Sequence, residues 1–409
     1  MKREVLDNGA VILSLKRPKD YTSRIIIASR LGSINEPKKK GGLAHLLEHT
    51  MLSADIKKIS FIKIAEIMDF LGGHQNAKTN YDSIRIYGYT QKPAFEKFSN
   101  ILMEISLNPV FNSKTFKNEK NIILTELRGY LDDPSRCVSD LFLQALYKKH
   151  PIKTSIRNKI RGLKRITMKD IVNNHKTYFS PNNLVVGIFG NFKKRSYNKL
   201  KIKLEGFNTK KISNMRISKE DMLPLKKRIV EKRRDMKQVY IQTGVKTTTI
   251  DSEDMHALRL ISALLTCGDS SRLFNELRLK RGLVYFVRSK NIIGRNFGFF
   301  YVKTRTQKQK GKQSLNIIKK VLKGLTTKKV SKKELKKAKN LIVGLRKAEY
   351  DNPVEGALRF VKDEIVLGNV NKERENMKKI KKVSEREIQQ VAKKYFNEDN
   401  FATAIIRPK

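Results

Sequence analysis

SKTFKNEKNIILTEL at residues 113–127 and SKKELKKAKNLIVGL at residues 331–345 are two versions of one segment. Upstream of them lies a second matching pair, YGYTQK at 87–92 and VKTRTQK at 302–308. The offset is nearly constant: 216 residues separate Thr90 from Thr306, and 219 separate Asn121 from Asn340. Similarity at a large, steady spacing indicates an internal repeat. We therefore expect two related α+β halves of about 200 residues each. The alternative is chance similarity in a lysine-rich chain.

Hydrophobic periodicity supports mixed secondary structure in both halves. Strand-like runs occur at 11–15, 25–28, 83–89, 184–189 and 239–241, and helix-like periodicity at 43–52, 95–107 and 115–131. Between residues 206 and 235 the apolar period disappears, and the sequence becomes polar and basic. Such a stretch is typical of an interdomain connection. The predicted organisation is a domain at 1–205, a linker at 206–235 and a second domain at 236–409.

Composition limits the class of protein. The chain has 409 residues with 88 Lys and Arg against 39 Asp and Glu, a formal charge of +49. This charge favours anionic neighbours, although a biased genome composition would produce it too. Two cysteines, Cys137 and Cys267, exclude a disulfide scaffold and fit a reducing cytosol. No window reaches the ~18 apolar residues of a membrane span. We expect a cytoplasmic protein without a membrane span.

The sharpest motif is His45-Leu46-Leu47-Glu48-His49. Residues four apart lie on one face of a helix, so both imidazoles can reach one ion. Glu48 falls at the edge of that face, where it can approach a water molecule beside the ion. Two neutral imidazoles suit Zn²⁺, and the H-x-x-E-H order is the inverted zinc-protease motif. The alternative is a surface helix with two solvated histidines.

A third ligand is expected from the segment at 115–131, whose apolar stripe is marked by Phe116, Ile123, Leu127 and Tyr130. Glu119 and Glu126 fall on that stripe, seven residues apart and therefore on one side of a helix. Carboxylates that face a core are costly unless they are paired, hydrogen-bonded or bound to a metal. The alternative is that both side chains reach solvent at the edge of the stripe.

The repeat provides an internal control for this prediction. Aligning Asn121 with Asn340 places Ala338 opposite Glu119 and Leu345 opposite Glu126. The second half also lacks any H-x-x-E-H sequence. The acidic pair therefore belongs to one half only, as a functional site would and a folding requirement would not.

With these residues the chain resembles the M16 metallopeptidases, the pitrilysin and insulinase family, and in particular their short two-domain, processing-type members. The resemblance covers nearly the whole chain, including GSINEPKKKGGLAHLLEHTML at 32–52, NEKNIILTEL at 118–127 and SSRLFNELRLKRGLVYFV at 270–287. Glu126 follows His49 by 77 positions, which matches the family's ligand spacing. The Phe-Lys-Gly-Thr run common after the motif is missing, and His74-Gln75 precede Asn76; both departures concern the shape of the pocket.

The resemblance implies a fold and a set of roles. The fold is α+β, with two homologous α/β-sandwich halves (LuxS/metallohydrolase-like) whose antiparallel or mixed sheets are covered by helices. One Zn²⁺ per chain would be bound by His45, His49 and Glu126. Glu48 would be the general base, and Glu119 a supporting residue beside the ligands. The implied substrate-binding residues are Asn76, Arg278 and Tyr285.

The expected function is a zinc-dependent endopeptidase that hydrolyses peptides or small unfolded proteins. The expected partners are this substrate and a second M16 chain, in a homodimer or heterodimer. One alternative is a basic protein that binds nucleic acid or an anionic surface on a peptidase scaffold. A third possibility keeps the enzyme and assigns the positive charge to its substrates, which predicts a preference for acidic peptides. No helix-turn-helix, zinc-finger spacing or RNA-binding aromatic motif occurs, which argues against a nucleic-acid partner.

Overall fold

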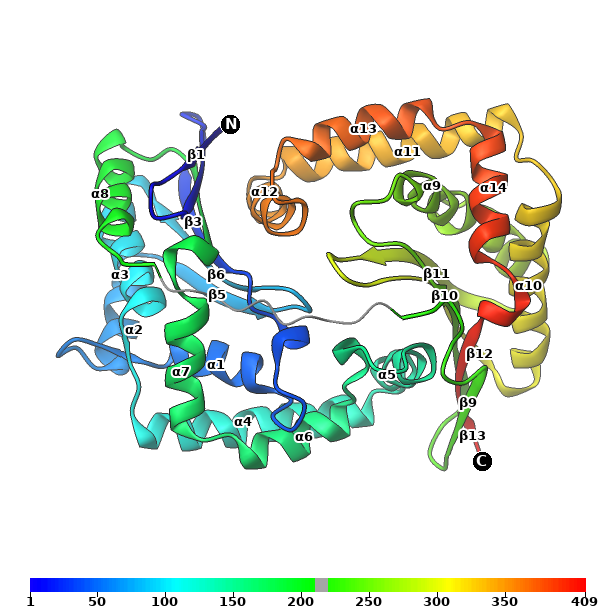
Figure 1. The fold of residues 1–409 in the computed structure, drawn as a ribbon, viewed down its shortest axis with the longest axis horizontal. Coiled ribbons are helices and arrows are strands. Elements are labelled where there is room, and N and C mark those ends of the chain that lie inside the picture. Colours follow the sequence, from blue (N-terminus) through cyan, green and yellow to red (C-terminus); the bar gives the residue numbers. More distant parts are fainter. Residues whose placement is uncertain (210–219) are drawn as a thin grey trace. The chain divides into compact units, whose positions relative to one another are not determined.

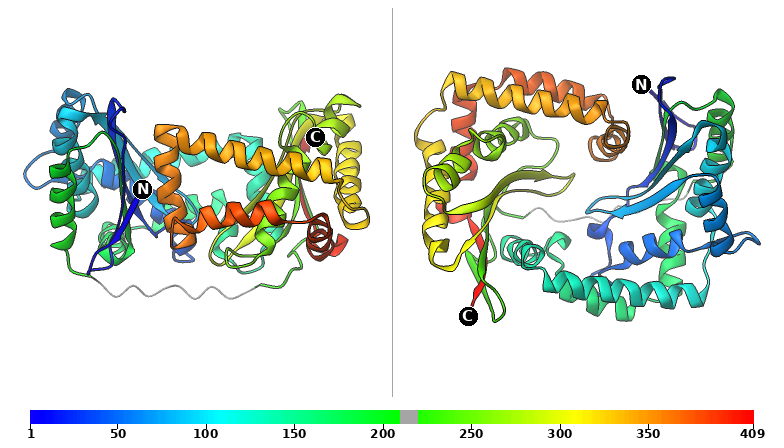
Figure 2. Two further views of the ribbon diagram at one scale, coloured as in Figure 1. Left: turned by 90° about the horizontal axis from the view of Figure 1, so that it is seen from above. Right: turned by 180° about the vertical axis from the view of Figure 1, so that it is seen from behind.

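The computed structural model describes residues 1–209 and 220–409, and the chain divides into two compact units. Unit 1 comprises Met1–Arg128, Arg157–Arg216 and Ala348–Val370, and unit 2 comprises Gly129–Ile156, Ile217–Lys347 and Asn371–Lys409. Each unit is a sheet with helices on it (Figures 1 and 2). Among the described residues, none of the helices has both the length and the apolar character needed to cross a bilayer.

The sheet of unit 1 has six strands in the order β1-β2-β8-β3-β6-β5. Its strands are β1 (Lys2–Val5), β2 (Val11–Lys16), β3 (Thr22–Ser29), β5 (His74–Thr79), β6 (Ile84–Gln91) and β8 (Leu184–Gly190). Strands β2 and β8 are parallel, and the remaining pairs are antiparallel. A separate two-stranded ladder joins β4 (Asp55–Ile56) to β7 (Pro109–Val110). Strand β5 is therefore an edge strand.

Both faces of this sheet are covered, because its strands are apolar on both sides. One face carries Ile26 and Ala28, which pack with Val361 of α12. On the other face, Gly88 leaves room for the Phe98 ring of α3, since a Cβ at Gly88 would lie 2.6 Å from it. The helices of unit 1 are α1 (Leu43–Leu52), α2 (Phe61–Phe70), α3 (Phe95–Leu107), α4 (Ser113–Asp132), α6 (Ile156–Arg165), α7 (Met168–Tyr178), α8 (Lys194–Glu205) and α12 (Pro353–Leu367).

Unit 2 has a five-stranded sheet in the order β11-β12-β10-β13-β9. Its strands are β9 (Arg228–Arg233), β10 (Gln238–Lys246), β11 (Val284–Ile293), β12 (Gly298–Gln307) and β13 (Ala402–Pro408). Only β9 and β13 are parallel. The helices are α5 (Pro134–Leu146), α9 (Asp254–Thr266), α10 (Gly311–Thr327), α11 (Lys332–Asp351), α13 (Lys372–Lys382) and α14 (Glu385–Tyr395), with a π-helical turn at Phe274–Leu279.

The two sheets confirm the internal repeat and the predicted α+β class. In each, one parallel pair (β2 with β8, β9 with β13) is followed by three antiparallel strands in the same order. The matching segment at 113–127 lies in α4, and the one at 331–345 lies in α11 apart from its first residue; both helices are 20 residues long. The repeat is therefore a repeat of structure as well as of sequence.

The predicted domain boundaries need two corrections. Residues 129–156 belong to unit 2 and residues 348–370 to unit 1, so neither unit is continuous in sequence. Helix α5 comes from the first half of the sequence but packs on the sheet of unit 2, and α12 comes from the second half but packs on the sheet of unit 1. Hydrophobic periodicity alone cannot reveal this exchange. The predicted linker at 206–235 is also wrong at its end, because residues 228–233 form β9. Part of that linker, residues 210–219, lies outside the described residues.

Candidate metal centre

The start of helix α1 is fixed by a left-handed glycine and by a carboxylate that caps its first turn. Gly42 has a left-handed backbone (φ 93°), and a Cβ there would approach the Leu163 side chain of α6 at 3.1 Å. The buried Glu36 carboxylate accepts hydrogen bonds from the backbone N–H groups of Gly42 (2.8 Å) and Ala44 (3.0 Å). The first N–H groups of a helix lack partners within the helix, so an acceptor here fixes where the helix starts. Glu36 thereby fixes the turn that carries His45.

The three polar residues of the motif converge on one side of α1. One candidate ligand atom each from His45, Glu48 and His49 lies within 4.8 Å of the others. The two imidazole rings meet edge to face, with centroids 4.8 Å apart and planes at 86°. The solvated-histidine alternative does not fit, because only 23% and 24% of these two side chains are exposed.

Helix α4 brings a carboxylate to both imidazoles. Glu126 Oε2 lies 3.6 Å from His45 Nε2 and 3.8 Å from His49 Nε2. These separations are too long for direct hydrogen bonds. A tetrahedral zinc ion with ligands at about 2.0–2.1 Å would hold neighbouring donor atoms about 3.4 Å apart. Both separations from the Glu126 oxygen are close to that value, and two imidazoles with one carboxylate are ligands that suit zinc.

Glu119 contacts His49, one of the candidate ligands. Its Oε2 is 3.0 Å from His49 Nδ1, and its Oε1 accepts a hydrogen bond from Ser53 Oγ at 2.6 Å. We assign the Nδ1 proton of His49 to this contact, which leaves the Nε2 lone pair directed toward Glu126. A carboxylate that fixes the tautomer of a ligating histidine is a recurring feature of zinc sites.

Glu48 is buried, with 6% of its surface exposed. Burial raises the pKa of its carboxyl group, and the nearby Glu126 adds to this effect, although the hydrogen bond from Thr79 and the charge of His49 oppose it. Thr79 lies on edge strand β5 and donates its hydroxyl hydrogen to Glu48 Oε2. A carboxylate with a raised pKa is a better proton acceptor than an ordinary glutamate, as a general base needs to be.

The two histidines have different electrostatic surroundings. Burial, reinforced by the positive charges of His49 and Lys159, lowers the pKa of His45 to about 3. Burial also lowers the pKa of His49, but the hydrogen bond to Glu119 and the charge of Glu48 outweigh it and raise that pKa overall. His45 is therefore neutral at pH 7, the form of imidazole that binds a metal.

Two family models match the chain one after the other. The first, described as Insulinase (Peptidase family M16), matches residues 11–159, and the second, described as Peptidase M16 inactive domain, matches residues 165–342. The chain belongs to peptidase family M16. The first M16 match contains α1 and α4 and hence every residue of the candidate metal centre. The second covers much of unit 2, where the motif is missing.

Curated M16-like relatives span the whole chain. An uncharacterized zinc protease of Rickettsia felis is 27% identical over 416 aligned positions, which cover 98% of this chain and 96% of the relative. An uncharacterized zinc protease of Bacillus subtilis is 24% identical over 100% of this chain and 98% of its own length.

Solved structures agree with the M16 fold. A protease from Helicobacter pylori superposes with a TM-score of 0.89 at 22% identity and covers 100% of this chain and 99% of its own. A peptidase M16 inactive domain from Pseudomonas fluorescens gives 0.89 at 18% identity, with coverages of 100% and 98%. At these identities the likeness shows the fold alone.

The predicted substrate residues lie on separate elements. Asn76 is exposed on β5 opposite Tyr87 of β6, and its Oδ1 accepts a hydrogen bond from the Ala77 N–H at 2.7 Å. In unit 2, the Arg278 guanidinium lies 5.0 Å from the centroid of the Tyr285 ring, whose residue is 73% exposed. The structure thus pairs Arg278 with Tyr285, while their role in substrate binding stays a prediction.

Sequence reasoning missed three residues of this site: Glu36, Ser53 and Thr79. Each acts through a hydrogen bond that depends on how a loop or strand folds back onto α1. For Glu36 a signal was present, since an acidic residue shortly before Gly41-Gly42 and a helical period is a candidate N-terminal cap. Ser53 and Thr79 carry no comparable signal.

Proposed function

We propose that this protein is a zinc-dependent endopeptidase that hydrolyses peptides or small unfolded proteins. The observation that carries the proposal is the position of Glu126 Oε2, which lies 3.6 Å from His45 Nε2 and 3.8 Å from His49 Nε2. We assign these three side chains as the ligands of one zinc ion per chain. A zinc ion bound there would act as a Lewis acid that polarises a scissile carbonyl and acidifies a water molecule.

Glu48 is assigned as the general base. Its carboxylate would take the proton of the attacking water and pass it to the leaving amine. The hydroxyl of Thr79 holds one carboxylate oxygen, which leaves the other for proton transfer. Glu119 would hold the His49 ring through Nδ1. Neither role requires a side chain from outside unit 1.

Substrate would enter as an extended strand. Strand β5 is at the edge of its sheet and ends at Thr79, the residue that contacts Glu48. Main-chain pairing along such an edge gives affinity with little dependence on sequence. Asn76 on the same strand, and Arg278 with Tyr285 from unit 2, are proposed to hold the substrate.

The test measures zinc content and cleavage of a quenched peptide library by the purified full-length protein. Glu48→Gln should retain one zinc per chain and lose about 10²–10⁴-fold in turnover. The matched control is Glu66→Gln, the same change at an exposed position of α2, which should leave both unchanged. Full cleavage after complete removal of zinc, or by Glu48→Gln, would reject the proposal.

A further inference from the structure

The α10–α11 corner is a strongly basic segment of unit 2. Residues 328–337 read KKVSKKELKK and contain six lysines and one carboxylate. The Glu334 carboxylate accepts two hydrogen bonds from Arg272, from Nε at 2.6 Å and from Nη2 at 2.8 Å. Lys337 donates to the backbone and side-chain oxygens of Ser270. Among the described residues, no ion pair joins any of the six lysines to a carboxylate. Their charge is therefore available to a ligand.

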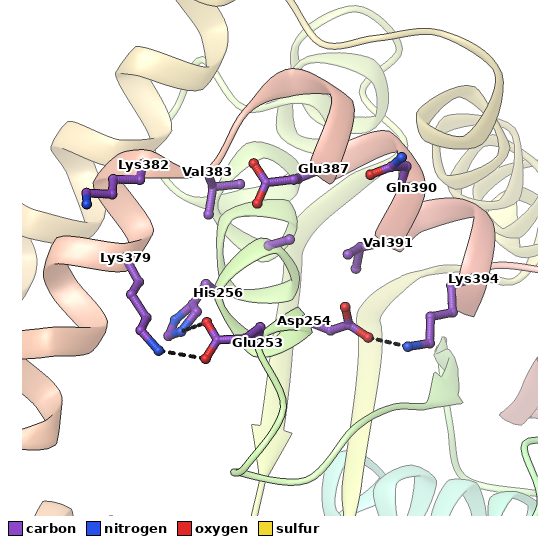
Figure 3. Close-up of a pocket in the computed structure, with 11 residues that line it drawn as sticks. Glu253, Asp254, His256, Lys379, Lys382, Val383, Glu387, Gln390, Val391 and Lys394 are labelled. Carbon is purple, nitrogen blue, oxygen red and sulfur yellow. Dashed lines mark hydrogen bonds and ion pairs between the residues drawn. The ribbon is translucent and has the colours of Figure 1, made fainter.

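In a hollow elsewhere in unit 2, by contrast, two lysines form ion pairs with carboxylates (Figure 3). The hollow encloses about 370 Å³ between α9 and the α13–α14 corner. Lys379 pairs with Glu253 and Lys394 pairs with Asp254, each at 2.6 Å. Because these lysines are neutralised inside the hollow, that site has little need of an anionic partner. The difference makes the α10–α11 corner the better candidate for binding an anion.

The basic corner opens into an apolar hollow along α11. This hollow has a volume of about 620 Å³, with Lys333 and Lys336 at one end and Leu341 and Leu345 at the other. Leu345 is 58% exposed, and a Cβ added to Gly344 would meet no atom within 4 Å. Leu341 and Leu345 together offer an apolar surface that a peptide side chain could cover.

We propose that this surface of α11 docks peptide segments in which acidic residues are followed by leucine-sized apolar ones. Lys333 and Leu345 are twelve residues apart on the helix, about 18 Å. An extended peptide covers that distance in about five or six residues. The apolar end favours a peptide over nucleic acid, whose bases stack on aromatic rings. The hollow lining contains no aromatic side chain.

The test is fluorescence anisotropy with a labelled peptide, Glu-Glu-Glu-Ser-Gly-Ser-Leu-Leu, at near-physiological salt. The full-length protein carries Glu48→Gln in every arm, so that the probe is not cut. Reversal of Lys332, Lys333 and Lys336 to Glu should weaken binding by at least about tenfold. The matched control reverses the three exposed lysines Lys312, Lys319 and Lys320 of the neighbouring α10, and should change binding less than about twofold.

Leu345→Ser tests the apolar end separately and should weaken binding about threefold without lowering the melting temperature, because Leu345 is exposed. Four results would overturn the proposal: no binding, equal losses in both triple variants, no effect of Leu345→Ser, or tighter binding of an oligonucleotide or anionic vesicle of matched charge. The assay needs neither zinc nor cleavage, so its failure leaves the proposed peptidase activity untouched.

Discussion

The two units have sheets of the same strand order, and α1 and α4 of unit 1 correspond to α9 and α11 of unit 2. These corresponding helices nevertheless carry different polar side chains. Between α1 and α4 lie two imidazoles and a carboxylate, spaced for an ion. Beside α9, the hydroxyls of Ser262 and Thr266 bond Ser289 of β11 at 2.9 and 2.8 Å. The place beside α9 in unit 2 thus holds hydroxyl hydrogen bonds, whereas the place between α1 and α4 in unit 1 holds the candidate ligands of an ion.

This difference separates folding from function. Unit 2 builds the same arrangement with hydroxyl pairs and apolar side chains, so the frame itself does not require a metal. Glu119 and Glu126, both partly buried on α4, stand where α11 has Ala338 and Leu345, so the shared fold does not itself require carboxylates at these places.

The largest effect is expected from Glu126→Gln. An amide binds zinc more weakly than a carboxylate, and Glu126 approaches both histidines. Zinc affinity should fall by more than about a hundredfold, beyond the loss typical of residues behind the ligands. The measurement is competition with a zinc chelator. Unchanged affinity would remove Glu126 from the ligand set.

Glu119→Gln should weaken zinc binding less, by about 10–100-fold. The amide can turn its oxygen to His49 Nδ1–H, but it loses the charge that makes the ring a stronger ligand. The same chelator competition applies, with Glu104→Gln on α3 as a control that removes a different partly buried carboxylate. A loss larger than that of Glu126→Gln would reverse the two assigned roles.

Unit 2 has a buried carboxylate with a structural use. Burial raises the pKa of Glu220. Hydrogen bonds from Lys246 and from the backbone N–H groups of residues 148–150 outweigh this effect and lower the pKa to about 2. Because the folded pKa lies below the unfolded one, this stabilisation is complete above about pH 4.5 and is lost as pH falls toward 2. The loss should be about 2 kcal/mol after solvent screening.

Urea unfolding of the protein and of Glu220→Gln between pH 7 and pH 3 measures this contribution. The variant should be less stable at neutral pH, and the difference should shrink as the solution becomes acidic. A difference that grows on acidification would contradict the assignment.

The smallest effect is expected from Glu36→Gln. The amide oxygen can accept from one N–H at the start of α1, and the second N–H loses its partner. We expect about 1 kcal/mol less stability and up to about tenfold weaker zinc binding, because His45 lies in the affected turn. Asn352→Ala removes a similar two-bond cap from α12 and should lower stability without changing zinc affinity. Equal zinc affinity in Glu36→Gln and the parent would contradict this role.

Local pattern predicted much of the fold and the centre of the site. Helical periodicity identified α3 at its observed bounds and α4 to within two residues at each end, and the motif identified α1. Strand β9 was missed because its sequence, RIVEKR, is rich in charged residues, which the outer strand of a sheet can accommodate. The exchange of α5 and α12 between the units was missed because an apolar helix face does not specify which sheet it covers. The cap from Glu36 and the bond from Thr79 depend on long-range geometry.

The measurement that tests the central claim most directly is anomalous diffraction at the zinc edge from crystals of the zinc-loaded protein. We predict one strong peak per chain, about 2.0–2.2 Å from His45 Nε2, His49 Nε2 and a Glu126 oxygen. A zinc-loaded crystal in which the peak lies elsewhere, or in which Glu126 does not approach it, would contradict the assignment of a shared metal site.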